Sequence, residues 1–243
     1  MELKEEVLKR VHEEVDKYNS KNVGVLFSGG RDSSILLKAL SEKRNINVFA
    51  ICISNGMQYY DNGGSDESIV GGQFQRIMLG HENNNVSINF LDARKSFQKY
   101  VMREIENDFT YRKHSSLLAC VGCKVIMHIM ACKFALDNRI DLIIDGFNGY
   151  QVDFPEQTKA CMETIGGMYE LYGINYSSPL YSILDKKEKV LKLMNDFGIF
   201  RKGEAKCMFA YSFSPGNSKE IKEYSERVLY KVAFSELCIG KRT

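Results

Sequence analysis

Short apolar runs alternate with longer amphipathic segments along this chain. The apolar runs have the length of buried strands and lie at 23–27, 47–53, 86–91, 141–145 and 175–178. The longer segments repeat apolar residues at helical spacing and cover 3–18, 33–42, 66–79, 93–107, 120–138, 156–172, 185–197 and 218–234. Strands that alternate with helices predict a parallel sheet covered on both faces. We therefore expect an α/β fold with a doubly wound, mostly parallel five-stranded sheet and a small helical C-terminal part.

The chain reads as one compact unit, because no Pro- or Ser-rich linker and no internal repeat divides it. The pattern of elements changes near 150–155, where strands give way to helices. We therefore expect an α/β part over 1–150 and a mainly helical part over 151–243 that packs on the first. The segment 54–64, SNGMQYYDNGG, reads as a long loop rich in Gly and Asn. Loops of this length inside a compact domain are often functional lids.

Composition and charge exclude some function classes. A net charge of +2 over 243 residues gives no electrostatic sign of nucleic-acid binding. The apolar stretch 126–136 is interrupted by His128 and Lys133, so it falls short of the roughly 20 apolar residues of a membrane span. Seven cysteines follow an N-terminus unlike a signal peptide, which favours a reducing compartment. We expect a cytoplasmic protein without a membrane partner, whose thiols act as ligands or nucleophiles.

The first predicted strand runs into the sequence SGGRDSS, residues 28–34, which precedes a predicted helix. Gly29 and Gly30 allow a sharp turn and a close approach of the backbone to a ligand. The helix start offers free N–H groups and the positive end of its dipole, and the serines offer hydroxyl donors. Such a site suits a phosphate. It is not a Walker phosphate loop, because no lysine stands at the required place.

This stretch resembles the SGGxDSS signature of the PP-loop ATP pyrophosphatases, an adenine nucleotide alpha-hydrolase-like family, with Arg31 at the variable position. The resemblance implies that the loop grips the pyrophosphate half of ATP, and that AMP passes to a substrate oxygen as pyrophosphate leaves. Asp32 is expected to act in catalysis with Mg²⁺ nearby, and Asp145 to face ATP or magnesium. The residues expected to bind ATP are Ser28, Gly29, Gly30, Arg31, Asp32, Ser33, Ser34, Ile53 and Gly146.

A C-x-x-C pair, Cys120 and Cys123, opens the long predicted helix. Residues three apart lie on the same helical face, so both sulfurs can point at one metal. Lys124 and the helix N-terminus are expected to favour thiolates there. Such a pair fits a redox couple, half of a zinc site or two ligands of an iron–sulfur cluster. His114 is a candidate fourth ligand for zinc.

Cys207 lies in a polar, loop-like context and is expected to join Cys120 and Cys123. The other thiols are expected to be structural, and they are Cys52, Cys132, Cys161 and Cys238. This arrangement resembles the tRNA-thiolating members of the same family, which carry C-x-x-C at the head of a helix before a strand that ends in glycine. Many of them have a third cysteine far downstream.

That resemblance implies a [4Fe-4S] cluster on Cys120, Cys123 and Cys207, with the fourth iron open to carry sulfur. Other members use two cysteines without a cluster, one of them as a persulfide, and here Cys120 and Cys207 are expected to be catalytic. Zinc and inert thiols stay open as alternatives. The family commonly has a histidine after the strand-end glycine, and Phe147 stands at that place.

The segment 149–157 follows the fourth predicted strand, where substrate-facing loops lie in such folds. Tyr150 is expected to stack on a base, and Gln151 or Asp153 to read its edge. The other interpretation is a helix N-terminus, with Asp153 near the cap and Pro155 in the first turn. No appended RNA-binding module is visible, so a free base, a nucleotide or another small carbonyl compound competes with tRNA as substrate.

Together these features predict ATP-dependent adenylation of a substrate carbonyl, followed by sulfur transfer from a donor to give a thiocarbonyl. One alternative keeps the adenylation and uses an amine nucleophile beside a structural zinc. Another is a non-catalytic sensor that binds adenine nucleotide. A homodimer is expected.

Overall fold

The computed structural model describes residues 2–60, 63–79, 85–110, 118–200, 206, 207, 209 and 217–237. Five strands form one parallel sheet in the order β4-β2-β1-β5-β6. They are β1 (Asn22–Leu26), β2 (Asn47–Ser54), β4 (Val86–Asp92), β5 (Leu142–Ile144) and β6 (Asn175–Ser177). The predicted five-stranded sheet is confirmed, and every pair in it is parallel. β2 lies on one side of β1 and β5 on the other, so the direction in which strands are added to the sheet reverses at β1. Folds of this kind bind ligands at such a switch point.

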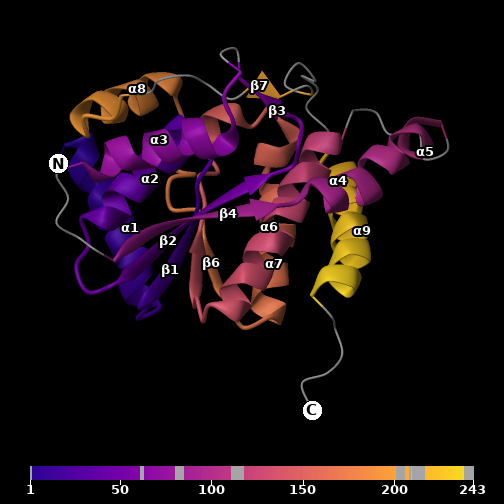
Figure 1. Ribbon diagram of the computed structural model, residues 1–243, viewed down its shortest axis with the longest axis horizontal. Helices are drawn as coiled ribbons and strands as arrows, with labels where there is room; N and C mark the ends of the chain where they lie inside the picture. The colour runs from indigo at the N-terminus through magenta and orange to yellow at the C-terminus, as the bar shows by residue number, and fades with distance from the viewer. Residues whose placement is uncertain are drawn as a thin grey trace.

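Helices cover both faces of the sheet (Figure 1). One layer packs with the first buried cluster and holds α1 (Leu3–Lys17), α2 (Arg31–Ser41), α3 (Asp66–Met78) and α8 (Lys187–Asp196). The opposite layer packs with the second cluster and holds α4 (Arg94–Tyr100), α6 (Ala119–Asp137), α7 (Lys159–Leu171) and α9 (Ser218–Glu236). Beyond position 150 the chain supplies an edge strand, β6, and helices to both layers.

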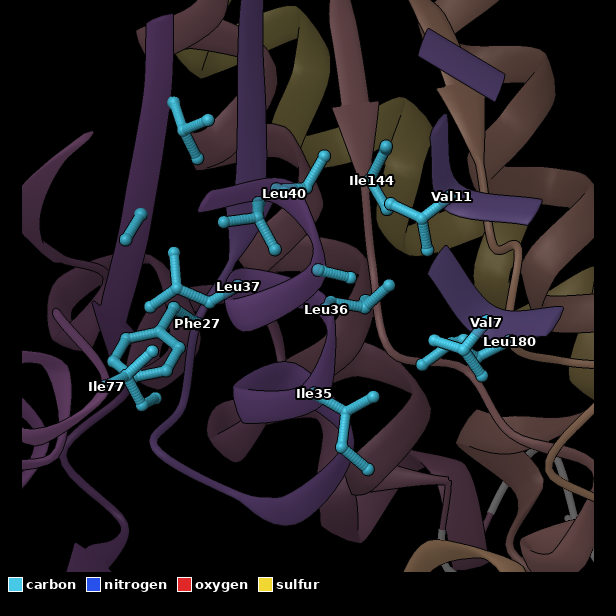
Figure 2. Close-up of a cluster of buried hydrophobic side chains, with 14 of the residues drawn as sticks. Val7, Val11, Phe27, Ile35, Leu36, Leu37, Leu40, Ile77, Ile144 and Leu180 are labelled. Carbon is cyan, nitrogen blue, oxygen red and sulfur yellow. The ribbon is translucent and has the colours of Figure 1, made fainter. Parts of the chain in front are cut away.

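Successive side chains of a strand point to opposite faces of the sheet, so the hydrophobic core consists of two clusters, one on each face. Val23 and Val25 of β1 join the cluster under α1 and α2, whereas Ile143 of β5 joins the cluster under α6. Figure 2 shows how Leu36, Leu37 and Leu40 of α2 enter the first cluster. Burying each such side chain contributes about 1.5–3 kcal/mol. The doubly wound architecture therefore follows from the two-residue period of the strands and the apolar stripes of the helices.

The structure corrects two predicted helices. The predicted helix over 93–107 is broken at Val101, which is fully buried at φ −116°, and continues as η1 (Met102–Glu104) and α5 (Ile105–Thr110). The predicted helix over 156–172 begins later, at Lys159, because the Thr158 side chain caps it. Before that cap the chain makes two 3₁₀ turns, η2 (Gly149–Gln151) and η3 (Pro155–Gln157).

A small antiparallel ribbon joins two segments that are far apart in the sequence. β3 (Gln58–Tyr59) lies inside the predicted loop 54–64 and pairs with β7 (Lys206–Cys207). Gln58 stands opposite Cys207, and Tyr59 opposite Lys206. The two strands lie side by side beyond one end of the sheet (Figure 1). The ribbon thereby brings Cys207 back to the loop that follows β2.

One helix in the described part of the chain, α6, is long and apolar enough to cross a membrane by length and composition. It is a core helix here, with Val125, Ile126 and Ile129 fully buried. It packs against α7 and α9. Its apolar character is therefore accounted for by packing inside the protein.

Candidate functional site

The turn between β1 and α2 has the geometry expected of an anion site. Gly29 has φ +68°, a conformation that glycine adopts without strain. Gly30 is the N-cap of α2 and provides no side-chain cap. The first N–H groups of an α-helix have no partner within the helix, so they are left for a ligand.

Hydrogen bonds of serine hydroxyls stabilise this turn. The Oγ of Ser28 accepts the backbone N–H of Gly30 at 3.2 Å, and the Oγ of Ser33 donates to the Gly30 carbonyl at 3.3 Å. The backbone N–H of Ser28 in turn donates to the Ser33 Oγ at 3.3 Å. The loop is therefore organised before any ligand arrives, which lowers the entropic cost of binding.

A cavity of about 250 Å³ lies beyond the carboxyl ends of β1 and β2 and is called the nucleotide cavity below. The predicted ATP-binding residues that line it are Ser28, Gly30, Asp32, Ser33, Ile53 and Gly146. Gly29, Arg31 and Ser34 are not part of its lining, and Ser34 is fully buried. Lys124 and Gln157 also line it, and residues that the sequence did not single out complete the wall, among them Gln58, Val70 and Met127.

Asp32 carries the one carboxylate among the described residues of this lining. Its Oδ2 accepts hydrogen bonds from the Asn148 amide at 3.0 Å and the Tyr150 hydroxyl at 3.4 Å. Burial raises the pKa of Asp32 to about 6, against the opposing effect of these partners and Arg31. Its Oδ1 is buried and has no hydrogen-bond partner in the described part of the chain, and the same holds for Oδ1 of Asn148. Two orphaned oxygens beside a phosphate loop fit a hard cation such as Mg²⁺.

Asp145 does not face the nucleotide cavity, which corrects the expectation that it meets ATP or magnesium. It is fully buried and accepts hydrogen bonds from Tyr176 at 3.0 Å and Ser178 at 2.6 Å. His128 Nε2 lies 3.1 Å from its Oδ2. Burial alone would raise the pKa of Asp145, but Lys124, His128 and Ser178 outweigh it and hold that pKa at about 2.

Lys124 connects this buried carboxylate to the open site. Its Nζ lies 3.7 Å from Oδ2 of Asp145 and 4.1 Å from the centre of the Phe147 ring. Phe147 is fully buried, so the residue at the family's histidine position serves as a platform under the lysine. Lys124 lines both the nucleotide cavity and the neighbouring cavity described next.

The second cavity, of about 370 Å³, is lined by Cys120 and Cys123 of α6 and by Cys207 of β7, and is called the cysteine cavity below. The three thiols that the sequence grouped together thus border one space. Its apolar walls include Phe97, Phe154 and Phe209. The two cavities share four lining residues, namely Gln58, Lys124, Met127 and Gln151.

Burial disfavours the thiolate forms of Cys120 and Cys123, contrary to the sequence expectation. Burial raises the pKa of Cys120 strongly and that of Cys123 to about 12, and the Lys124 charge offsets only a little of the shift at Cys123. The Asn55 amide donates a hydrogen bond to Sγ of Cys123 at 2.6 Å. Asn55 is buried and was not predicted, because its role depends on a contact between distant segments.

Within the described residues, no three His, Cys, Asp or Glu side chains are close enough together to hold a single metal ion. Thiols spread around one cavity suit a group of several atoms better than a lone ion. His114 and Cys238 lie outside the described residues. The remaining cysteines, Cys52, Cys132 and Cys161, are buried as expected, and Cys52 also lines the nucleotide cavity.

The predicted substrate residues lie at different places. Tyr150 directs its hydroxyl toward Asp32, as described above. Gln151 lines both cavities, and its side-chain carbonyl accepts the Asn148 amide at 3.0 Å. Asp153 is exposed and is not part of the lining of either cavity.

The architecture is a doubly wound α/β fold with a cavity at the switch point of its parallel sheet. Among solved structures, the fold is similar to that of the U34-tRNA thiolase NcsA from Methanococcus maripaludis with its [4Fe-4S] cluster. The TM-score is 0.53 at 16% identity, and the alignment covers 94% of this chain and 76% of that one. No protein-family model matches the sequence, and comparison with curated proteins gave no match. The expected fold is confirmed by this likeness.

Proposed function

We propose that this protein uses ATP to adenylate the carbonyl oxygen of a nucleobase-type substrate and then replaces that oxygen with sulfur. The observation that carries the proposal is the shared wall between a cavity at a phosphate-type loop and a cavity bordered by three cysteines. A carbonyl activated on one side of Lys124, Met127 and Gln151 lies within reach of sulfur on the other side. Neighbouring sites of this kind favour the reaction by proximity.

The adenylation half relies on the loop and on Lys124. The N-terminus of α2 binds the pyrophosphate part of ATP, and the lysine charge and Mg²⁺ offset the charge of the triphosphate. Asp32 and Asn148 would hold the magnesium through their orphaned oxygens. The substrate oxygen attacks the α-phosphorus, and the bond to the bridging oxygen breaks as pyrophosphate leaves with its electron pair. The contribution of the protein to this half is positioning and charge stabilisation.

The sulfur half relies on the cysteine cavity. A [4Fe-4S] cluster fits the donor set, since three thiols border one cavity; Cys120, Cys123 and Cys207 would hold it, and it would supply an iron that binds sulfur. The apolar walls of the cavity exclude water that would hydrolyse an adenylated substrate. Sulfur at the thiol level attacks the activated carbon, the carbon–oxygen bond breaks, and AMP leaves. The solved structure with the similar fold is named as a thiolase with such a cluster, which supports this assignment.

The test compares anaerobically purified wild-type protein with Cys207→Ala and with Cys132→Ala, a buried thiol away from the cavity. Iron, inorganic sulfide and zinc are measured, together with release of pyrophosphate and formation of thiolated product from uridine and from transfer RNA. We expect Cys207→Ala to lose iron and thiolated product while it still releases pyrophosphate, and Cys132→Ala to keep all of them. Wild-type protein that releases no pyrophosphate with uridine, with transfer RNA or with any other nucleobase-type carbonyl compound would refute the proposal. If wild-type protein without iron forms thiolated product, the sulfur carrier is a persulfide and not a cluster.

A further inference from the structure

Glu156 is a carboxylate in the cysteine cavity that the reaction described so far does not use. It lies in η3, which packs against α6, and it lines the cavity together with the three cysteines. Its Oε2 is buried and finds no hydrogen-bond partner among the described residues. An unsatisfied buried carboxylate oxygen is costly, so its presence at a ligand-sized cavity points to a partner supplied by the ligand.

The neighbours of Glu156 do not meet this need. Lys124 borders the same cavity, but its ammonium lies against Asp145 and the Phe147 ring. The rest of the nearby wall is largely apolar, with Phe154 and Phe209 among its members. A mostly apolar cavity with a few polar groups is the usual form of a small-molecule site, in which those groups set specificity.

Gln151 provides a complementary group in the same cavity. Its side-chain carbonyl is engaged by Asn148 at 3.0 Å, so its NH₂ group is the end that can donate to a ligand. Glu156 is an acceptor and Gln151 a donor. An acceptor and a donor that line one cavity match the N–H and C=O of a lactam ring edge.

We propose that Glu156 accepts a hydrogen bond from the ring N–H next to the carbonyl that is activated, and that the substrate is therefore a lactam of the uracil type. This inference rests on the proposed function and narrows its substrate class. A cytosine-type ring presents a lone pair at that position and would be repelled by the carboxylate. An N-methylated lactam would lose the hydrogen bond and clash with the carboxylate.

The same contact makes the Glu156 carboxylate the acceptor of the proton that the ring nitrogen loses. When the lactam oxygen attacks the α-phosphorus, HN–C=O becomes N=C–O–AMP, so the N–H proton must leave as pyrophosphate departs. The Glu156 carboxylate takes that proton. When hydrosulfide adds to the carbon and AMP leaves with the electrons of the carbon–oxygen bond, the proton returns to nitrogen and the sulfur proton is released. The product is HN–C=S, and no oxidant or reductant is consumed.

The experiment measures equilibrium binding of uridine, 3-methyluridine and cytidine in the presence of an ATP analogue that cannot be cleaved between the α- and β-phosphates. We expect wild-type protein to prefer uridine over both by about tenfold or more. Glu156→Leu should abolish this preference, and Glu156→Asp should restore part of it. Glu156→Gln keeps an acceptor, so it should keep the binding preference while uridine-dependent pyrophosphate release with ATP falls about tenfold or more. Glu170→Leu, an exposed change on α7, is the matched control.

Wild-type protein without a preference for uridine would overturn the inference, and so would a Glu156→Leu variant that keeps the preference. Equal affinity of every variant for the ATP analogue shows that each one is folded. Release of pyrophosphate in response to another carbonyl substrate, together with loss of the uridine preference, would leave the proposed function standing while this inference falls. The two failures are thereby distinguishable.

Discussion

The side-chain amide of Asn148 donates a hydrogen bond to Oδ2 of Asp32 at 3.0 Å. This contact joins the loop after β5 to the phosphate-type loop after β1, and β1 and β5 are neighbouring strands at the switch point. It leaves one oxygen of each side chain buried without a partner in the described structure. The position of Asp32 is therefore set before a cation or nucleotide binds.

Asp32→Asn should make the nucleotide-free protein more stable at pH 8 and abolish pyrophosphate release. The pKa of Asp32 is raised to about 6 by burial, against about 3.9 in an unfolded chain. Because the pKa is raised, the contribution of Asp32 to stability is fully present below pH 4 and is lost as the pH rises through 6, by roughly 2–3 kcal/mol. Urea denaturation of both proteins between pH 4 and 8 measures the difference. A wild-type curve that stays parallel to that of the variant would contradict the burial of this charge.

Gly146→Ala should weaken ATP binding without unfolding the protein. A methyl group at this position would lie 3.2 Å from Cβ of Asp32 and 3.3 Å from the backbone nitrogen of Ser33, tighter than ordinary contact. The phosphate-type loop would have to shift, and overpacking of this kind costs about 1–3 kcal/mol, or about tenfold in affinity. Calorimetric titration with ATP and Mg²⁺ measures the loss. Gly167→Ala, with open space around the added methyl group, is the control and should bind as wild type does.

Asp145→Asn should destabilise the protein by about 3 kcal/mol, because it leaves the Lys124 charge and the polar groups around it without their acceptor. The folded pKa of Asp145 is about 2, below the unfolded value of about 3.9. Its stabilisation is therefore complete above pH 4 and disappears as the pH falls toward 2. Denaturation at pH 7 and pH 3 should show the gap between variant and wild type shrinking in acid. Asp185→Asn, which removes an exposed ion pair, should change stability by less than about 1 kcal/mol.

Asn55→Ala should separate the two halves of the proposed reaction. The Asn55 amide donates to Sγ of Cys123 at 2.6 Å, and it touches the cysteine cavity without lining the nucleotide cavity. Pyrophosphate release should persist, whereas formation of thiolated product should fall about tenfold with the loss of a hydrogen bond to sulfur. Product analysis by mass spectrometry beside a pyrophosphate assay distinguishes the two. Equal loss of both activities would place Asn55 in the general fold, and Asn89→Ala, which removes an exposed hydrogen bond in β4, controls for that.

Local sequence pattern was enough to predict the sheet and the phosphate-type turn. A strand, two glycines and a helix start stand next to each other in the chain, so Ser28 to Ser33 could be placed without knowing any distant contact. The C-x-x-C pair at the head of α6 was readable for the same reason. The break at Val101 was missed because an apolar helix pattern continues through it.

The rest of the site depends on contacts between residues that are far apart in the sequence, and no local sequence pattern indicates such contacts. Gln58 and Cys207 each lie in a strand of two residues, too short to produce a periodic pattern. Lys124 was expected only as a charge beside the C-x-x-C pair, and Glu156 only as a member of the segment 149–157. The packing of η3 and of the loop after β5 on α6 brings both residues to one cavity. Asp145 was misplaced because a residue that follows a three-residue strand can turn to either face of the sheet, and here hydrogen-bond partners on the α6 side hold it inward.

Because the β3–β7 ribbon includes Cys207, the cysteine cavity is completed later during synthesis than the nucleotide cavity. Every described residue that lines the nucleotide cavity lies between Leu26 and Gln157, so this part of the lining has left the ribosome before Cys207 does. The third thiol joins its partners only when β7 pairs with β3, across one of the widest sequence separations in the fold. A ribbon of two residues per strand has little stability of its own, so this closure depends on the surfaces already formed beneath it. A chain shortened before β7 would keep the described lining of the nucleotide cavity and lack the third thiol of the cysteine cavity.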